Sequence, residues 1–114
     1  MGMEAFAVFD TDQKVPSGTT PDLLAQLLFE YVPRSAEWMS VPDEDDPVGA
    51  NWTPKWTAIA EAVAEIERFL GSDAASRMAI SGFSTKELVE ELKLFCDELR
   101  GATSHTARFH LCVY

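Results

Sequence analysis

Four consecutive acidic residues, Asp43, Glu44, Asp45 and Asp46, form the densest cluster of chemically active side chains in this sequence. Carboxylates are hard oxygen donors of the kind that calcium prefers. The run lacks the alternating acids and the closing glutamate of a calcium-binding loop, and neighbouring side chains on an extended chain point in opposite directions. The sequence therefore predicts no metal and no other cofactor. An acidic surface that attracts a basic partner fits the run better.

The two histidines, His105 and His110, are the candidates for acid–base chemistry, because histidine titrates near neutral pH. Serines and acids that could complete a triad are present, but the sequence has neither a Gly-x-Ser-x-Gly motif nor a phosphate-binding glycine loop. His110 falls on the polar face of a predicted strand, which favours a surface or partner-facing position. A small enzyme using His110 or His105 is therefore an alternative hypothesis.

Three tryptophans bracket the acidic run: Trp38 precedes it, and Trp52 and Trp56 follow it. Exposed tryptophan beside carboxylates is typical of a protein–protein interface, in which the rings anchor the partner and the acids steer it. We expect Trp38 and Trp52 to lie in a loop, partly exposed, and Trp56 to begin the buried face of a helix. The alternative is a solvated acidic loop without a partner.

Composition narrows the class of protein. The 114 residues suffice for one domain, residues 1–114, and the net charge of −10 repels nucleic acid and anionic membranes. Cys96 and Cys112 lie among apolar residues and are predicted to be buried free thiols. No apolar run approaches the roughly 18 residues of a membrane span, and no signal peptide is visible. A cytoplasmic protein that binds neither nucleic acid nor membrane is expected.

Helix-start signals divide the chain into elements. Thr20-Pro21 and Thr53-Pro54 each combine a capping residue with a proline at the first helical position, and Ser84 with Glu87 forms a capping box. Apolar residues then recur at helical spacing. The predicted helices cover residues 21–32, 54–70 and 84–100, with Gly71 closing the second in the left-handed conformation and Gly101 ending the third.

Three segments read as strands. Residues 3–9 are a nearly continuous apolar run, residues 77–81 a weaker one, and residues 106–113 alternate between apolar and polar side chains. Strands separated by helices favour a parallel sheet with right-handed crossovers. The predicted fold class is therefore α/β, a small three-stranded parallel sheet with helices in the order β-α-α-β-α-β. Residues 33–52 are expected to be an irregular loop that is either functional, partly ordered by a short helix around residues 35–39, or simply mobile.

The segment that opens the second predicted helix, Gly49-Ala-Asn51-Trp52-Thr53-Pro54-Lys55-Trp56-Thr57-Ala58-Ile59, resembles the signature of barstar-like ribonuclease inhibitors, a family of bacterial immunity proteins. That family carries Gly-x-Asn at the entrance to its second helix, followed by aromatic residues. The predicted element order is similar to that of the family, whose small parallel sheets end on a strand. Phe95-Cys96-Asp97 is similar to the family's Phe-x-acid pattern, in which the acid joins the inhibitory face.

The resemblance has one departure with consequences for mechanism. The family places acids where this chain has Thr53 and Thr57, and those acids plug the cationic site of the nuclease. Thr53 can cap a helix but carries no charge, so the nearby run of residues 43–46 would have to supply the negative charge.

These observations predict a cytoplasmic immunity protein that occludes the active site of a basic toxin, most simply a nuclease. Carboxylates would mimic substrate phosphates, and tryptophans would fill adjacent apolar hollows. A small acidic adaptor or secretion chaperone, which binds through apolar surface, is the other non-enzymatic alternative. The predicted partner-binding residues are Asp43, Glu44, Asp45, Asp46, Asn51, Trp52, Thr53, Trp56, Thr57 and Asp97.

Overall fold

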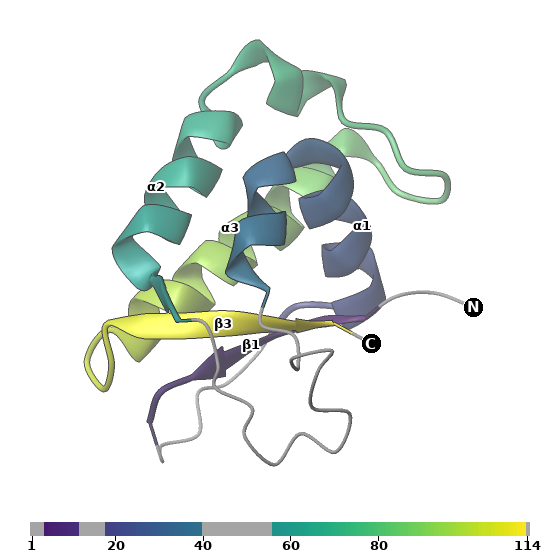
Figure 1. Ribbon diagram of the computed structural model, residues 1–114. Coiled ribbons are helices and arrows are strands. Elements are labelled where there is room, and N and C mark those ends of the chain that lie inside the picture. Colours follow the sequence, from purple (N-terminus) through teal and green to yellow (C-terminus); the bar gives the residue numbers. More distant parts are fainter. Residues whose placement is uncertain (1–3, 12–17, 40–55, 114) are drawn as a thin grey trace.

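The computed structural model describes residues 4–11, 18–39 and 56–113, in which helices cover one face of a three-stranded sheet (Figure 1). No helix in these ranges is long and apolar enough to cross a membrane. The elements in chain order are β1 (Ala5–Phe9), α1 (Pro21–Tyr31), η1 (Pro33–Trp38), β2 (Thr57–Ala58), α2 (Ile59–Leu70), η2 (Asp73–Arg77), α3 (Thr85–Ala102) and β3 (Arg108–Val113), where η marks a 3₁₀ helix.

The sheet has the strand order β1-β3-β2, and both pairings are antiparallel. Phe9 lies opposite Phe109 in one pairing, and Thr57 lies opposite Phe109 in the other. The predicted parallel sheet is therefore wrong. The crossover rule assumes that consecutive strands are joined by one helix, whereas β1 and β2 are separated by α1, η1 and a long further segment, which leaves the direction of the return strand free.

The predicted strand at residues 77–81 is also wrong, because η2 ends at Arg77 and a turn follows it. Gly82 takes a φ of 93°, which only glycine adopts without strain. The hydroxyl of Tyr31 satisfies the backbone of Ala79, accepting its N–H and donating to its carbonyl, each at 3.0 Å. The segment therefore needs no sheet partner there, and Met78, 1% exposed, anchors it to the core.

Helix boundaries follow the predictions at some ends and not at others. The α1 helix matches the predicted range within one residue, whereas α2 begins at Ile59 because Thr57 and Ala58 pair with β3 instead. Gly71 has a φ of −82°, in the right-handed region, so the predicted left-handed closure is wrong. The α3 helix runs through Gly101 to Ala102, so the predicted end at Gly101 is wrong too.

The N-terminal cap of α3 is confirmed. The Ser84 hydroxyl oxygen accepts the backbone N–H of Glu87 at 3.2 Å and donates to the Glu87 carboxylate at the same distance. This pairing satisfies one of the backbone donors that a helix leaves unpaired at its start. It therefore fixes where the longest helix of the described chain begins.

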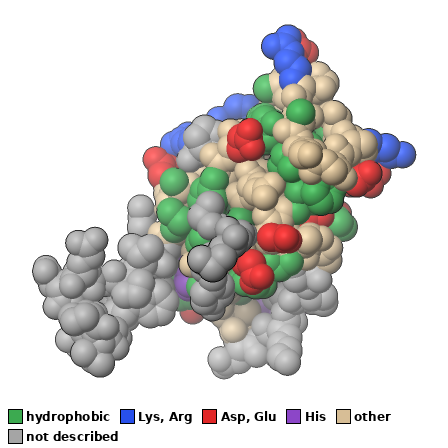
Figure 2. All heavy atoms as spheres, turned by 90° about the vertical axis from the view of Figure 1, so that its right-hand side faces the viewer, with side chains coloured by type: hydrophobic (Ala, Val, Ile, Leu, Met, Phe, Trp, Pro, Cys, Tyr) green, Lys and Arg blue, Asp and Glu red, His purple; other side chains and the backbone are tan. Residues whose placement is uncertain are grey.

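The core lies between the helices and the sheet. Its largest fully buried side chains include Phe95, Phe109, Leu24, Leu27, Leu28, Ile59, Ile66, Met78, Leu88, Leu92, Leu99 and Leu111. Trp38 joins them at 4% exposure and meets the Phe109 ring edge-on at a centroid distance of 6.1 Å. The expectation that Trp38 is partly exposed is therefore wrong, and of the alternatives for this segment the structure shows the short helix, η1. On the face seen in Figure 2, acidic side chains are scattered among apolar ones rather than gathered.

Candidate partner-binding site

The predicted acidic and aromatic segment falls largely outside the described residues: this applies to Asp43, Glu44, Asp45, Asp46, Asn51, Trp52 and Thr53. The described residues on either side of it both meet β3. Met39 forms a parallel bridge with Leu111, and the Trp56 ring contacts His110. The chain therefore leaves and re-enters the described part at the same strand.

Trp56 is half-buried beside β3 and does not lie in the helix. Its ring meets His110 edge-on, with centroids 5.2 Å apart, and the guanidinium carbon of Arg108 lies 5.2 Å from its centroid. Arg108 is held in turn by Asp10, whose carboxylate accepts its Nε–H at 2.5 Å. The cation–π contact and the ring contact hold the Trp56 ring against β3.

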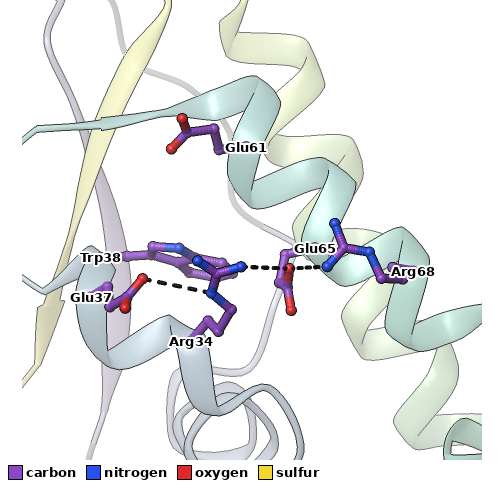
Figure 3. Close-up of a pocket in the computed structure, with 6 residues that line it drawn as sticks. All are labelled: Arg34, Glu37, Trp38, Glu61, Glu65 and Arg68. Atoms are coloured by element: carbon purple, nitrogen blue, oxygen red, sulfur yellow. Dashed lines mark hydrogen bonds and ion pairs between the residues drawn. The ribbon is translucent and has the colours of Figure 1, made fainter.

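Two adjoining cavities lie between η1, β2 and α2, and we name them together the acidic–aromatic groove. The first, of about 290 Å³, is lined by Arg34, Glu37, Trp38, Glu61, Glu65 and Arg68 (Figure 3). The second, of about 380 Å³, is lined by Glu37, Trp38, Trp56, Thr57, Ala58 and Glu61. Glu37, Trp38 and Glu61 border both cavities, which makes the groove continuous.

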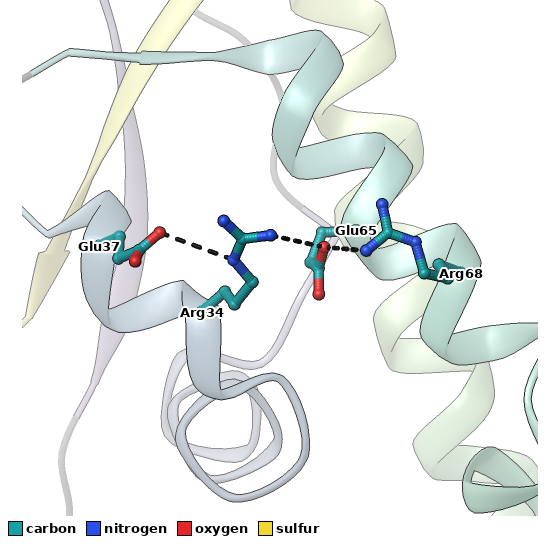
Figure 4. Close-up of polar contacts among 4 residues, drawn as sticks. All are labelled: Arg34, Glu37, Glu65 and Arg68. Carbon is teal, nitrogen blue, oxygen red and sulfur yellow. Dashed lines mark hydrogen bonds and ion pairs between the residues drawn. The ribbon is translucent and has the colours of Figure 1, made fainter.

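Charge is distributed unevenly along this groove. In the first cavity, Glu65 accepts a bond from Arg68 at 2.8 Å and lies 3.8 Å from Arg34, which also lies 3.7 Å from Glu37 (Figure 4). Glu61 is exposed, stands apart from these contacts in Figure 3, and pairs with no cation of the described chain. The second cavity therefore carries two carboxylates and no described cation in its lining.

The structure brings some predicted site residues together and separates another. Trp56 and Thr57 both line the second cavity, although Thr57 is only 9% exposed. Asp97 lies elsewhere, on α3, where the Arg100 guanidinium is 3.5 Å away and also pairs with Glu67 of α2. Its side chain is exposed, but a cation of the same helix already offsets its charge.

Sequence reasoning missed the acids that border the groove, Glu37 and Glu61. Two signals point toward them. Glu37 directly precedes Trp38 within the short helix that the sequence predicts, and Glu61 falls off the apolar stripe of the helix that ends at Leu70. An acid beside a tryptophan, together with an acid on the polar face of the next helix, identifies the two walls of the groove.

His110 is buried at 4% exposure, which contradicts its predicted surface position. The alternation of β3 predicts one buried face and one open face, but the Trp56 ring lies against His110 on the second face. Burial lowers the pKa of His110, and a backbone hydrogen bond to Leu111 opposes that shift. A neutral imidazole is therefore favoured there. His105 lies exposed in the turn after α3.

Two other titratable groups are held in the interior. Burial raises the pKa of Glu91 and nearby Asp22 raises it further, although the carboxylate accepts the backbone N–H of Thr20. Burial, with a smaller contribution from Asp97, raises the pKa of the Cys96 thiol to about 11, which makes it a poor nucleophile at neutral pH.

Within the described ranges no set of three histidines, cysteines or acids is placed to hold a metal ion.

The fold and the groove define a small α/β domain with a surface channel in which two carboxylates lie beside the half-buried Trp56 and the buried Trp38. Comparison of the sequence and the structure with protein-family models, curated proteins and solved structures finds no match. The antiparallel sheet also differs from the parallel sheet that the barstar resemblance implies. That resemblance therefore depends on the local motifs at residues 49–59 and 95–97 and stays a prediction.

Proposed function

We propose that this chain is a cytoplasmic inhibitory protein that occludes the cationic site of a basic protein toxin, most simply a nuclease. The observation that carries the proposal is the second half of the groove. There Glu37 and Glu61 border the tryptophans Trp38 and Trp56, and no described cation lines the cavity. Nucleases hold phosphates with arginine and lysine, so a protein surface with carboxylates at matching positions competes with the substrate.

Each part of the groove has a separate energetic role in this proposal. The net charge of −10 accelerates encounter with a basic protein. The Glu37 and Glu61 carboxylates pair with cations once water is excluded, and Trp56, fixed by its contacts to His110 and Arg108, supplies apolar contact at little entropic cost. The four acids of residues 43–46 stay predicted contributors, to be tested by replacing all of them with Asn and Gln.

The test measures inhibition of a basic nuclease, beginning with the product of a toxin reading frame adjacent to this gene. The double variant Glu37→Gln/Glu61→Gln is compared with Glu30→Gln/Glu90→Gln, whose exposed acids lie on α1 and α3 and change the net charge equally. We expect the groove variant to lose at least about tenfold in inhibition and the control to lose about twofold or less. Equal losses, or no inhibition by the unmodified chain, would reject the proposal.

Salt separates this mechanism from the adaptor or chaperone alternative. Binding through carboxylates weakens steeply as ionic strength rises, because exposed charges are screened beyond a Debye length of about 8–10 Å. Binding through apolar surface changes much less. An affinity that is flat between low and high salt would therefore favour an apolar adaptor over an inhibitor that mimics phosphates.

A further inference from the structure

Arg34 of η1 lies between two carboxylates of the groove without closing on either. Its Nε atom is 3.7 Å from a Glu37 oxygen, and a terminal nitrogen is 3.8 Å from a Glu65 oxygen (Figure 4). Charge-assisted hydrogen bonds of this type normally span about 2.7–2.9 Å. The Arg34 side chain is 62% exposed and that of Arg68 is 69% exposed, so exposure does not distinguish the two cations. Arg68, in contrast, contacts Glu65 at 2.8 Å. Arg34 is therefore the loosely held cation of the pair.

We propose that Arg34 is an internal stand-in for an arginine of the partner. In the free chain its guanidinium occupies the position between Glu37 and Glu65, and an arginine of a basic protein takes that position on binding. The proposal rests on the basic partner proposed above. It adds the side chain that the groove recognises and a contact that competes with this recognition.

The groove fits a guanidinium better than an ammonium. Arginine presents a planar fork of donors that can bridge two carboxylates, whereas lysine is a point charge. Trp38 lines both cavities, and an aromatic ring beside the carboxylates favours a planar cation. The chain itself already pairs one guanidinium with an aromatic ring of this surface, at Arg108 and Trp56. The cost of displacing Arg34 is small, because exposed ion pairs are worth little.

The test compares Arg34→Gln with Arg77→Gln, using a nona-arginine peptide as the probe. Arg77 of η2 is exposed and forms no ion pair with the described residues, so both variants make the net charge one unit more negative. We expect Arg34→Gln to bind nona-arginine about two- to fivefold more tightly than Arg77→Gln does. Equal affinities, or weaker binding by Arg34→Gln, would overturn the proposal. Thermal melts establish that both variants are folded.

A nona-lysine peptide supplies the second arm. The advantage of Arg34→Gln over Arg77→Gln should shrink to less than about twofold with this probe, since lysine cannot bridge the two carboxylates in the same way. An equal advantage with both peptides would overturn the preference for arginine. The nuclease assay is independent of both peptides. If Arg34→Gln binds nona-arginine selectively more tightly but the chain inhibits no nuclease, the guanidinium site is supported and the inhibitory function is rejected. If the chain inhibits a nuclease but Arg34→Gln shows no selective tightening, the inhibitory function is supported and the guanidinium site is rejected.

Discussion

The acidic–aromatic groove and a cavity on the α2–α3 surface contain similar charged residues but differ in how those charges are paired. The α2–α3 cavity, of about 270 Å³, is lined by Glu67, Leu70, Lys93, Cys96, Asp97 and Arg100. Its two carboxylates both pair with Arg100, and Lys93 adds a further cation. In the groove, Glu61 has no described cation and Glu37 is only loosely paired with Arg34.

This difference shows why a count of acids is a poor guide to a binding surface. Asp97 and Glu61 each contribute one carboxylate to the sequence. Arg100 lies three residues after Asp97 on the same helix, and its positive charge partly offsets that of the Asp97 carboxylate. No arginine or lysine lies three or four residues before Glu61, and Glu65 lies one turn after it. The helix spacing thus leaves Glu61 without a cation of the described chain, whereas Asp97 has Arg100 3.5 Å away.

The largest expected effect is the loss of stability caused by a substitution in the core beneath both surfaces. Leu92 is fully buried on α3, as predicted, and Leu92→Ala should lower the free energy of unfolding by about 2–5 kcal/mol through lost apolar contact and a residual cavity. Denaturant melts measure the loss. Because Leu92 lines neither surface cavity, the affinity of the folded variant for a basic partner should be unchanged. A loss of stability below about 1 kcal/mol would show that this part of the core is not packed as described.

Trp56→Ala addresses the aromatic part of the groove. We expect binding to a basic partner to weaken by about 2 kcal/mol, the loss typical of an anchoring aromatic residue, and Trp56→Phe to recover part of it. Calorimetric titration measures both values. Phe69→Ala serves as the control, since Phe69 is a half-buried aromatic residue of α2 that lines neither half of the groove. Equal losses for the two alanine variants would remove Trp56 from the interface.

Glu91 is a third kind of acid, neither exposed nor offset by a cation in the described contacts. Its pKa in the folded chain is raised above the unfolded value, so the folded state holds the proton more tightly. Its contribution to stability is then fully present below the unfolded pKa and is lost as pH rises through the folded pKa. Glu91→Gln should therefore gain stability relative to the unmodified chain as pH rises from 4 to 7. Thermal melts across that range would contradict this if the difference stayed constant or reversed.

The sequence predicted those features that depend on local signals. Pro21 marked the start of α1, although Thr20 forms no side-chain cap there, the Ser84 cap marked the start of α3, and the alternation of residues 106–113 located β3. The direction of the strands could not be predicted in this way, because it depends on pairing between segments about 50 or 100 residues apart. The two residues of β2 are also too few to show an alternating pattern.

The sequence predicted the types of residue in the candidate site, but not which acids lie there. The combination of acids with tryptophan is present in the described groove, and Trp56 and Thr57 belong to it. The particular acids could not be identified from the sequence, because a carboxylate becomes available only when no cation of a neighbouring element reaches it. Arg34, for example, lies 3.8 Å from Glu65, which is 31 positions later in the sequence. The local sequence around either residue does not indicate a tertiary ion pair of this kind.

The most direct test of the account compares Glu61→Gln with Asp97→Asn, two variants of equal charge change on the two surfaces. Their affinities for the same basic nuclease, or for nona-arginine, are measured by calorimetric titration at low and physiological salt. We expect Glu61→Gln to weaken binding by about 1 kcal/mol and Asp97→Asn to change it by less than about 0.3 kcal/mol, because Arg100 near Asp97 reduces the attraction of that carboxylate for a partner's cation. Equal losses, or a larger loss for Asp97→Asn, would contradict the assignment of the groove as the binding surface.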